Sequence, residues 1–248
     1  MSLKHKIAPV ALSVPLMFAL SGTALAETAT SANLEELNNS GASGSAMAMV
    51  DGSAVHVTVQ ANGVLAGAPH AQHIHFGAEA RHECPTMAED KDGNGRLNTT
   101  EGAPAYGPVA ASLTLTGDTG PKSVLAVDRF PTPQGESYSY DRQIEVSSEL
   151  AQAIQAGQGV VVVHGVDYDN SGKYDGAEKS DLNPALPTEA TDPAICGVLA
   201  VAPAGGADTG AGGAMETNEV NNALVGLGSG LVLLAAGGGA FVARRARD

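Results

Sequence analysis

The chain has 248 residues, of which 43% are hydrophobic and 16% charged, so it is too apolar for a disordered chain and fits one domain with terminal extensions. Thirteen Lys and Arg against 27 Asp and Glu give a net charge of −14, which repels phosphate backbones and excludes a nucleic-acid partner. Tryptophan is absent and aromatic residues make up 4%, so we expect a core of Val, Ala, Leu and Ile.

The amino terminus has the pattern of a secretory signal peptide. Two lysines precede an apolar stretch at 7–20, and small residues at 24–26 predict cleavage after Ala26. A buried helix is the alternative, but Pro9 and Pro15 would break it. Export places the two cysteines of the chain in an oxidising compartment, where one disulfide is expected.

The middle of the chain predicts an all-β domain. After a linker at 27–45, we expect a domain at 46–202 in which alternating valines, as at 55–59, mark strands. The candidate strands are residues 46–60, one beginning at 64–65, 72–76, 109–115, 123–130, 138–146, 159–166 and 196–201. One short helix begins at Ser147 or Ser148 and ends at Gly157. Short strands between Gly and Pro turns favour a Greek-key sandwich or barrel.

Histidines form the first candidate site. His73 and His75 are two residues apart, so they share one face of a strand. His164 follows four valines, where a polar side chain needs a specific partner. Imidazole sets suit copper or zinc, so these three residues predict a metal site, with His70 or His82 as a further candidate ligand. The alternative is a hydrogen-bonded structural cluster.

Two acidic segments, 90–101 and 167–178, fit the twelve-residue EF-hand calcium loop, with Gly at position 6 and an apolar residue at position 8. The candidate ligand positions are Asp90, Asp92, Asn94, Arg96, Asn98 and Glu101 in the first loop and Asp167, Asp169, Ser171, Lys173, Asp175 and Glu178 in the second. An Asx-rich surface turn is the alternative. We expect neither loop to have the usual EF-hand helix on both of its sides. The loops would then not act as helix-pair switches, and calcium would have a structural role.

The carboxyl terminus predicts an anchor. Residues 223–243 carry no charge and precede a basic tail at 244–248; at ~1.5 Å per residue they span ~30 Å of hydrocarbon, with the tail cytoplasmic and the main domain outside. A Gly-rich spacer at 203–222 joins them.

Within this spacer, residues 206–210 resemble a degenerate sortase signal, which implies cleavage after Thr209 and attachment to the cell wall. The alternative is a spacer before a plain membrane anchor. Display on the extracellular face follows in both cases.

A family resemblance covers roughly residues 55–201. The segment His-Ala-Gln-His-Ile-His-Phe-Gly at 70–77 resembles the copper-binding strand of Cu/Zn superoxide dismutases, and 162–164 is similar to the later copper-ligand strand. The segment 194–198 resembles the strand of the second half-cystine. The resemblance implies copper ligands at His73, His75 and His164 and a Cys84–Cys196 disulfide.

The chain also departs from that family. Asp90 stands near the place of the bridging histidine, and no histidine lies between His82 and His164, so no zinc site is expected. Pro193 replaces the arginine that guides superoxide. His82 is the candidate substitute ligand.

A second resemblance concerns residues 148–157 and the following run to 164, which are similar to the CHRD domain, a β-sandwich without established catalysis. Two functions follow. We expect a cell-surface, calcium-stabilised, copper-binding β-sandwich that acts as a binding or adhesion module, with another surface macromolecule as a candidate partner. The alternative is a copper-only superoxide dismutase-like enzyme.

Overall fold

The computed structural model describes residues 28–201. The predicted signal peptide with Ala26, the spacer with Thr209, the membrane segment and the basic tail lie outside the described residues. Among residues 28–201, no helix has the length and apolar character needed to cross a membrane.

The described chain is mostly β-structure, with few helices. The strands are β1 (Thr28–Glu36), β2 (Ser43–Asp51), β3 (Ala54–Asn62), β4 (Gln72–His75), β5 (Val109–Ser112), β6 (Ser137–Glu145), β7 (Val160–His164), β8 (Pro193–Val198) and β9 (Ala200–Val201). The helices are α1 (Thr99–Tyr106) and α2 (Ser148–Gln155), with short 3₁₀ turns η1 (Met87–Glu89), η2 (Pro121–Ser123), η3 (Val127–Arg129) and η4 (Thr188–Ala190).

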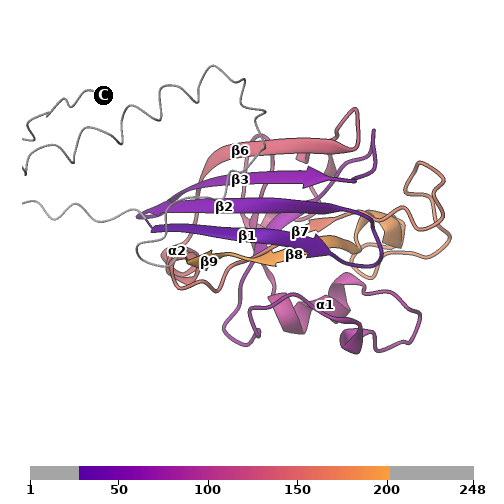
Figure 1. Cartoon of the computed structure of the whole chain (residues 1–248), viewed down its shortest axis with the longest axis horizontal. Helices are drawn as coiled ribbons and strands as arrows, with labels where there is room; N and C mark the ends of the chain where they lie inside the picture. The colour runs from indigo at the N-terminus through magenta and orange to yellow at the C-terminus, as the bar shows by residue number, and fades with distance from the viewer. Residues whose placement is uncertain (1–27, 202–248) are drawn as a thin grey trace, which may run out of the picture. The chain divides into compact units, whose positions relative to one another are not determined.

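The strands form one curled antiparallel sheet in the order β5-β4-β7-β8-β1-β2-β3-β6, with β9 paired to β1. Strand β1 joins the two halves, because it pairs with β2 along most of its length while Glu35 and Glu36 at its end pair with β8. Figure 1 shows β6, β3, β2 and β1 side by side, with β8 and β7 beyond β1.

The core lies between these two halves of the sheet. One cluster of buried residues contains Leu34 and Val57 from the β1–β2–β3–β6 half together with Ile74, Val163 and Ile195 from the other half. Because successive side chains in a strand point to opposite faces, the neighbours of Ile74 and Val163 point away from this core. They face a second cluster, in which Tyr106 of α1 packs on Val160, Val162 and Cys196.

Part of the predicted linker at 27–45 is a strand, β1, and not a linker. Thr30, Ala32 and Leu34 alternate inward along the strand, and their neighbours are exposed. The residues are small and mostly weak strand formers, so the strand is stabilised by pairing with β2 and β8 and by burial of one face.

Three further predictions differ from the structure. The predicted strand 46–60 is a hairpin, β2 and β3, with Gly52 in its turn at φ +63°. No strand begins at 64–65. The predicted strand 123–130 is replaced by the turns η2 and η3, because Ser123 donates a hydrogen bond to Asp118 and the backbone closes local bonds.

Helix α2 confirms the predicted helix. The Ser147 hydroxyl accepts a hydrogen bond from the Leu150 amide at 3.1 Å, which satisfies one of the free donors of the first turn. The helix ends before Gly157, whose φ of +74° is a conformation that glycine adopts without strain.

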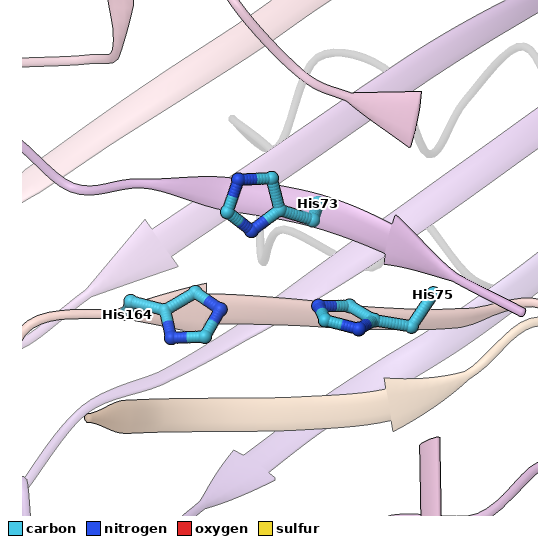
Figure 2. A group of neighbouring side chains, drawn as sticks. All are labelled: His73, His75 and His164. Atoms are coloured by element: carbon cyan, nitrogen blue, oxygen red, sulfur yellow. The ribbon is translucent and has the colours of Figure 1, made fainter. Parts of the chain in front are cut away.

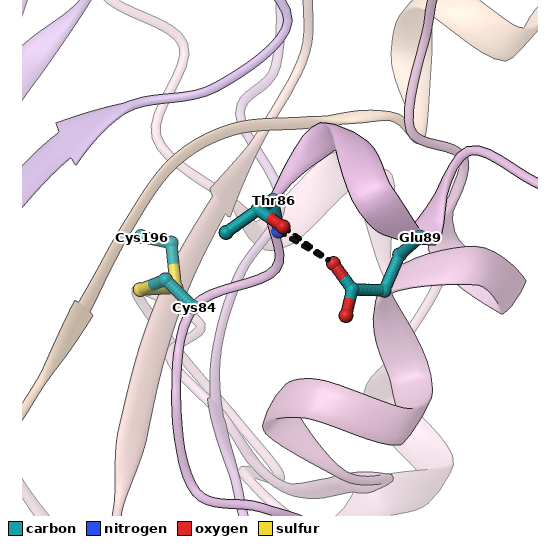
Figure 3. The surroundings of a disulfide bond; sticks show 4 residues. All are labelled: Cys84, Thr86, Glu89 and Cys196. Carbon is teal, nitrogen blue, oxygen red and sulfur yellow. Dashed lines mark hydrogen bonds between the residues drawn. A yellow bond between two sulfur atoms is a disulfide. The ribbon is translucent and has the colours of Figure 1, made fainter.

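The disulfide joins Cys84 to Cys196, as the resemblance implied, across a sequence separation of 112 residues. It fastens the segment before η1 to strand β8 (Figure 3), and Glu89 accepts a hydrogen bond from Thr86 at the start of that turn. The long segment that contains the first acidic loop and α1 is therefore tied to the sheet at its beginning.

We predict that the double substitution Cys84→Ala/Cys196→Ala lowers the free energy of unfolding by about 2–5 kcal/mol, because an open chain regains the entropy that a closed loop of this length removes from the unfolded state. Urea unfolding of the full chain followed by circular dichroism measures this loss. A change below about 1 kcal/mol, well under the usual range for a native disulfide, would contradict it.

Candidate metal centre

Three buried histidines meet on the face of β4 and β7 that points away from the main core. The strand register places His73 opposite Val162 and His75 opposite Val160, and His164 ends β7. One ring nitrogen of each histidine lies within 4.8 Å of one ring nitrogen of the other two. Figure 2 shows the three rings turned toward a common space.

Backbone carbonyl groups hold the other nitrogen of each ring. His73 Nε2 lies 3.1 Å from the Val124 oxygen, His75 Nδ1 2.9 Å from the Gly107 oxygen and His164 Nδ1 2.6 Å from the Thr191 oxygen. A carbonyl oxygen only accepts hydrogen bonds, so each of these nitrogens carries the proton and donates. The opposite nitrogen of each ring then has a free lone pair.

These free nitrogens, His73 Nδ1, His75 Nε2 and His164 Nε2, are buried and have no hydrogen-bond partner among the described residues. Leaving a buried polar group unpaired costs about 1–3 kcal/mol. Three such groups in one place therefore cost an appreciable part of the ~5–15 kcal/mol by which a domain is stable. Hydrogen bonds among the described residues leave these three lone pairs unused, and one metal ion could use all of them.

Burial keeps the rings neutral. Together with repulsion from His164 when that ring is protonated, it lowers the pKa of His75 to about 3. It also lowers the pKa of His164 to about 4 and that of His73 well below its ordinary value. Because only the neutral imidazole binds a metal, the three nitrogens stay available in weakly acidic solution.

The two further candidate histidines do not join this cluster. Both ring nitrogens of His70 lie against backbone oxygens, those of His164 and Leu65, and Tyr174 also contacts the ring. His82 Nε2 bonds to the Gly77 oxygen while its ring stacks on Phe76. Neither histidine belongs to the candidate ligand group. His70 was a candidate because it precedes His73 closely, and His82 because it could substitute for the missing family histidine.

Helix α1 positions His75. The Tyr106 ring packs on the His75 ring with centroids 4.4 Å apart, and the next residue, Gly107, supplies the carbonyl that orients it. Gly107 has φ +91°, a backbone conformation that a side chain strains. At the other end of the helix, the Thr99 hydroxyl donates to the Thr191 oxygen at 2.8 Å, the same oxygen that holds His164.

A pocket of about 250 Å³ opens over the three histidines, all of which line it. Most of its wall is aliphatic, with Ala103 from α1, Val124 and Val127 from the η2–η3 segment, and Leu182 and Leu186 from the segment before η4. No Asp, Glu, Lys or Arg belongs to the lining that the described residues form. The site therefore combines nitrogen donors at its base with an uncharged wall.

The first acidic loop gathers three of its predicted ligands. Asp90, Asp92 and Glu101, at positions 1, 3 and 12, place carboxylate oxygens within 4.8 Å of one another. Asn98 caps α1: its side chain accepts a hydrogen bond from the Glu101 amide, and the Glu101 carboxylate accepts one from the Asn98 amide. A three-residue 3₁₀ turn, η1, precedes this loop and α1 begins within it, so the loop lacks an α-helix on both sides, as expected. Asn94 turns its side-chain oxygen to the Arg96 amide instead.

The second acidic loop gathers a ligand that the sequence did not predict. Asp167 and Asp169 meet Glu189, which lies in η4 and is 2% exposed, whereas Glu178 at position 12 does not join them. The Glu189 carboxylate accepts bonds from the amides of Tyr168, Asp175 and Gly176. No motif marks Glu189, because it approaches the loop only through the tertiary fold.

Other predicted ligands of this loop make hydrogen bonds or an ion pair elsewhere. Ser171 donates its hydroxyl to Asp175 and to the Lys173 oxygen. Glu178 pairs with Arg96 of the first loop at 2.5 Å, and the Arg96 guanidinium lies 4.0 Å from the centre of the Tyr168 ring. The two acidic loops therefore contact each other through Arg96.

A buried carboxyl group lies beside the second loop. Asp192 is 1% exposed and accepts hydrogen bonds from the Tyr168 and Thr188 hydroxyls. The pKa of Asp192 is raised to about 7, mainly by burial and partly by the nearby Asp181 carboxylate, while the two hydroxyl donors act in the opposite direction. The charge of this side chain therefore changes near neutral pH.

Comparison with known proteins gives no family. No protein-family model matches the chain, and no curated protein matches it in sequence.

We predict that Asp192→Asn changes the pH dependence of stability. Because the pKa of Asp192 is raised above its unfolded value of ~3.9, its contribution is fully present at low pH and is lost as pH rises through about 7. The melting temperature of the variant relative to the parent should rise from about pH 4 to about pH 7 and then level off. Thermal melts in chelator measure it; a constant or falling difference would contradict the raised pKa.

Proposed function

We propose that the protein binds one copper ion through His73 Nδ1, His75 Nε2 and His164 Nε2. The observation that carries this proposal is the set of three buried lone pairs without a hydrogen-bond partner, each fixed by a carbonyl on the far side of its ring. Outer partners of this kind are what metal-bound histidines ordinarily have. Imidazole-only donors suit copper and zinc, and the resemblance of 70–77 and 162–164 to the dismutase copper strands favours copper.

A binding function agrees better with the pocket than dismutase activity does. Superoxide is an anion, and an enzyme that uses it gains from cationic side chains near the metal. The described lining contains no cationic side chain. The Asp181 carboxylate accepts a hydrogen bond from the amide of Thr100, which lines the pocket, and adds negative charge nearby. We therefore propose copper binding on the cell surface as the function, with dismutase-like chemistry as the alternative.

We propose calcium as the ion of the two acidic loops. Calcium prefers several hard oxygen ligands, and each loop brings three carboxylates together: Asp90, Asp92 and Glu101 in one, and Asp167, Asp169 and Glu189 in the other. Neutralising these charges would stabilise the long segments that carry Gly107 and Thr191, the residues that orient two of the histidines.

The wider setting is also a proposal. A shared core between the two halves of the sheet supports the Greek-key sandwich of the dismutase-like or CHRD-like type. The Cys84–Cys196 disulfide is compatible with export, which the amino-terminal pattern predicts. A membrane or cell-wall anchor and a macromolecular surface partner complete this hypothesis.

We predict that the full chain, equilibrated with copper and freed of excess, retains about one copper ion by elemental analysis, as a three-imidazole site implies. His73→Gln and His164→Gln should each weaken copper binding by more than ~100-fold, because even changes in the outer partners of metal ligands cost 10–100-fold. His56→Ala is the matched control, since His56 lies on β3 and pairs with Asp141.

Copper retained equally by His164→Gln and the parent would overturn the assignment. A loss of copper in His56→Ala, with no change in the two cluster variants, would place the ion elsewhere on the surface. Zinc competition in the same samples decides between the two metals that suit imidazole.

We predict that calcium at about 100 times its Kd stabilises the metal-free chain by about 2.7 kcal/mol for each site filled, which raises the melting temperature by about 5–10 °C. Glu189→Gln should remove the contribution of the second loop, because a neutral amide replaces its buried carboxylate. Glu178→Gln is the control and should keep the full shift, since Glu178 pairs with Arg96 instead.

The reverse result, with the calcium shift lost in Glu178→Gln and kept in Glu189→Gln, would restore the ligand set of the linear motif. No calcium shift in the parent would overturn calcium binding by both loops.

A further inference from the structure

The pocket over the histidines has an apolar entrance as well as an apolar wall. Val127 and Leu182, at 42% and 43% exposure, are two of the large hydrophobic side chains that the described surface leaves exposed, and both line this pocket. Exposed aliphatic side chains at the mouth of a cavity that leads to buried donors mark a ligand entrance more specifically than scattered surface hydrophobics do.

The volume limits the ligand. An apolar cavity of ~150 Å³ accepts benzene, and this pocket measures about 250 Å³. A single substituted ring, or an aliphatic molecule of the same size, therefore fits. Larger molecules of the kind that occupy pockets of ~300–1,000 Å³ exceed the space.

Charge limits the ligand further. A carboxylate or other anion that enters must lose its water shell, which is costly without a cationic partner, and the described lining offers none. Burial raises the pKa of Tyr106 in the wall, and the carboxylates of Asp181 and Asp192 lie close enough to raise it further. Two effects therefore disfavour an anion in the pocket: the loss of its water shell and repulsion by the nearby carboxylates.

We propose that this pocket admits neutral, apolar molecules of about single-ring size to the metal held by His73, His75 and His164. The inference rests on the proposed copper site for the metal and on the pocket itself for the ligand class. It assigns the open side of the metal to an uncharged ligand, and not to superoxide or another anion.

The test compares two ligands that share a pyridine ring and a nitrogen donor. The full chain is loaded with Cu(II) and titrated, at mildly alkaline pH, with 3-methylpyridine or with nicotinate, which carries a carboxylate at the same ring position. The electron paramagnetic resonance spectrum of the copper reports coordination. We expect nicotinate to need at least a tenfold higher concentration than 3-methylpyridine.

A substitution at the entrance provides the matched control. Leu182→Arg introduces a cation and should improve nicotinate binding by about tenfold or more, while Leu182→Gln, which is polar and uncharged, should not. Toluene, which has no donor atom, should displace 3-methylpyridine from the parent, because both occupy the apolar volume.

Equal binding of the two pyridines by the parent, or displacement by nicotinate but not by toluene, would overturn the inference while leaving the copper site intact. Copper that does not occupy the three histidines would overturn the proposed function by itself. In that case, saturation-transfer NMR of toluene on the metal-free chain still decides the ligand class: a signal that Leu182→Arg weakens supports the apolar pocket, and no signal refutes it.

Discussion

Three hydrogen bonds from imidazole rings to backbone carbonyls determine the chemistry of this fold. Each bond fixes the proton on the ring nitrogen that faces the carbonyl. The other nitrogen, His73 Nδ1, His75 Nε2 or His164 Nε2, therefore carries a lone pair without a partner among the described residues. The strands place the rings on one face, but the carbonyls come from irregular segments: Gly107 after α1, Val124 after η2 and Thr191 after η4. The loops therefore determine whether the strand histidines form a site.

These loops are connected to the acidic segments. Helix α1 begins in the first acidic loop, where Asn98 and Glu101 cap it, and ends at the carbonyl that holds His75. Its Thr99 hydroxyl also binds the Thr191 oxygen. Glu189, which completes the second acidic group, lies two residues before Thr191 in the same turn. The proposed neutralisation of charge in either loop would therefore act on the segments that orient the imidazoles.

The sequence predicted the features that follow from local geometry. The pleat of a strand places His73 and His75 on one face whatever the fold, and Ser147 and Gly157 delimit α2 through caps that act within one turn. Features that depend on tertiary pairing were missed. Strand β1 has threonine as its only favoured strand residue, and Glu189 reaches the second acidic loop from η4. Residues 123–130 were a candidate strand, but local hydrogen bonds of Ser123 and Asp118 favour turns.

The structure keeps two kinds of donor apart. The buried cluster offers only imidazole nitrogens, and each acidic group offers only carboxylate oxygens. Nitrogen donors favour copper or zinc, whereas hard oxygen donors favour calcium, so the proposed copper and calcium ions would compete little for the same atoms. The separation extends to the surroundings, because an aliphatic wall covers the histidines while the acidic loops are largely exposed. A protein with net charge −14 thus attracts cations at its surface, and the proposal assigns the imidazole cluster of the described residues to an ion that prefers nitrogen donors.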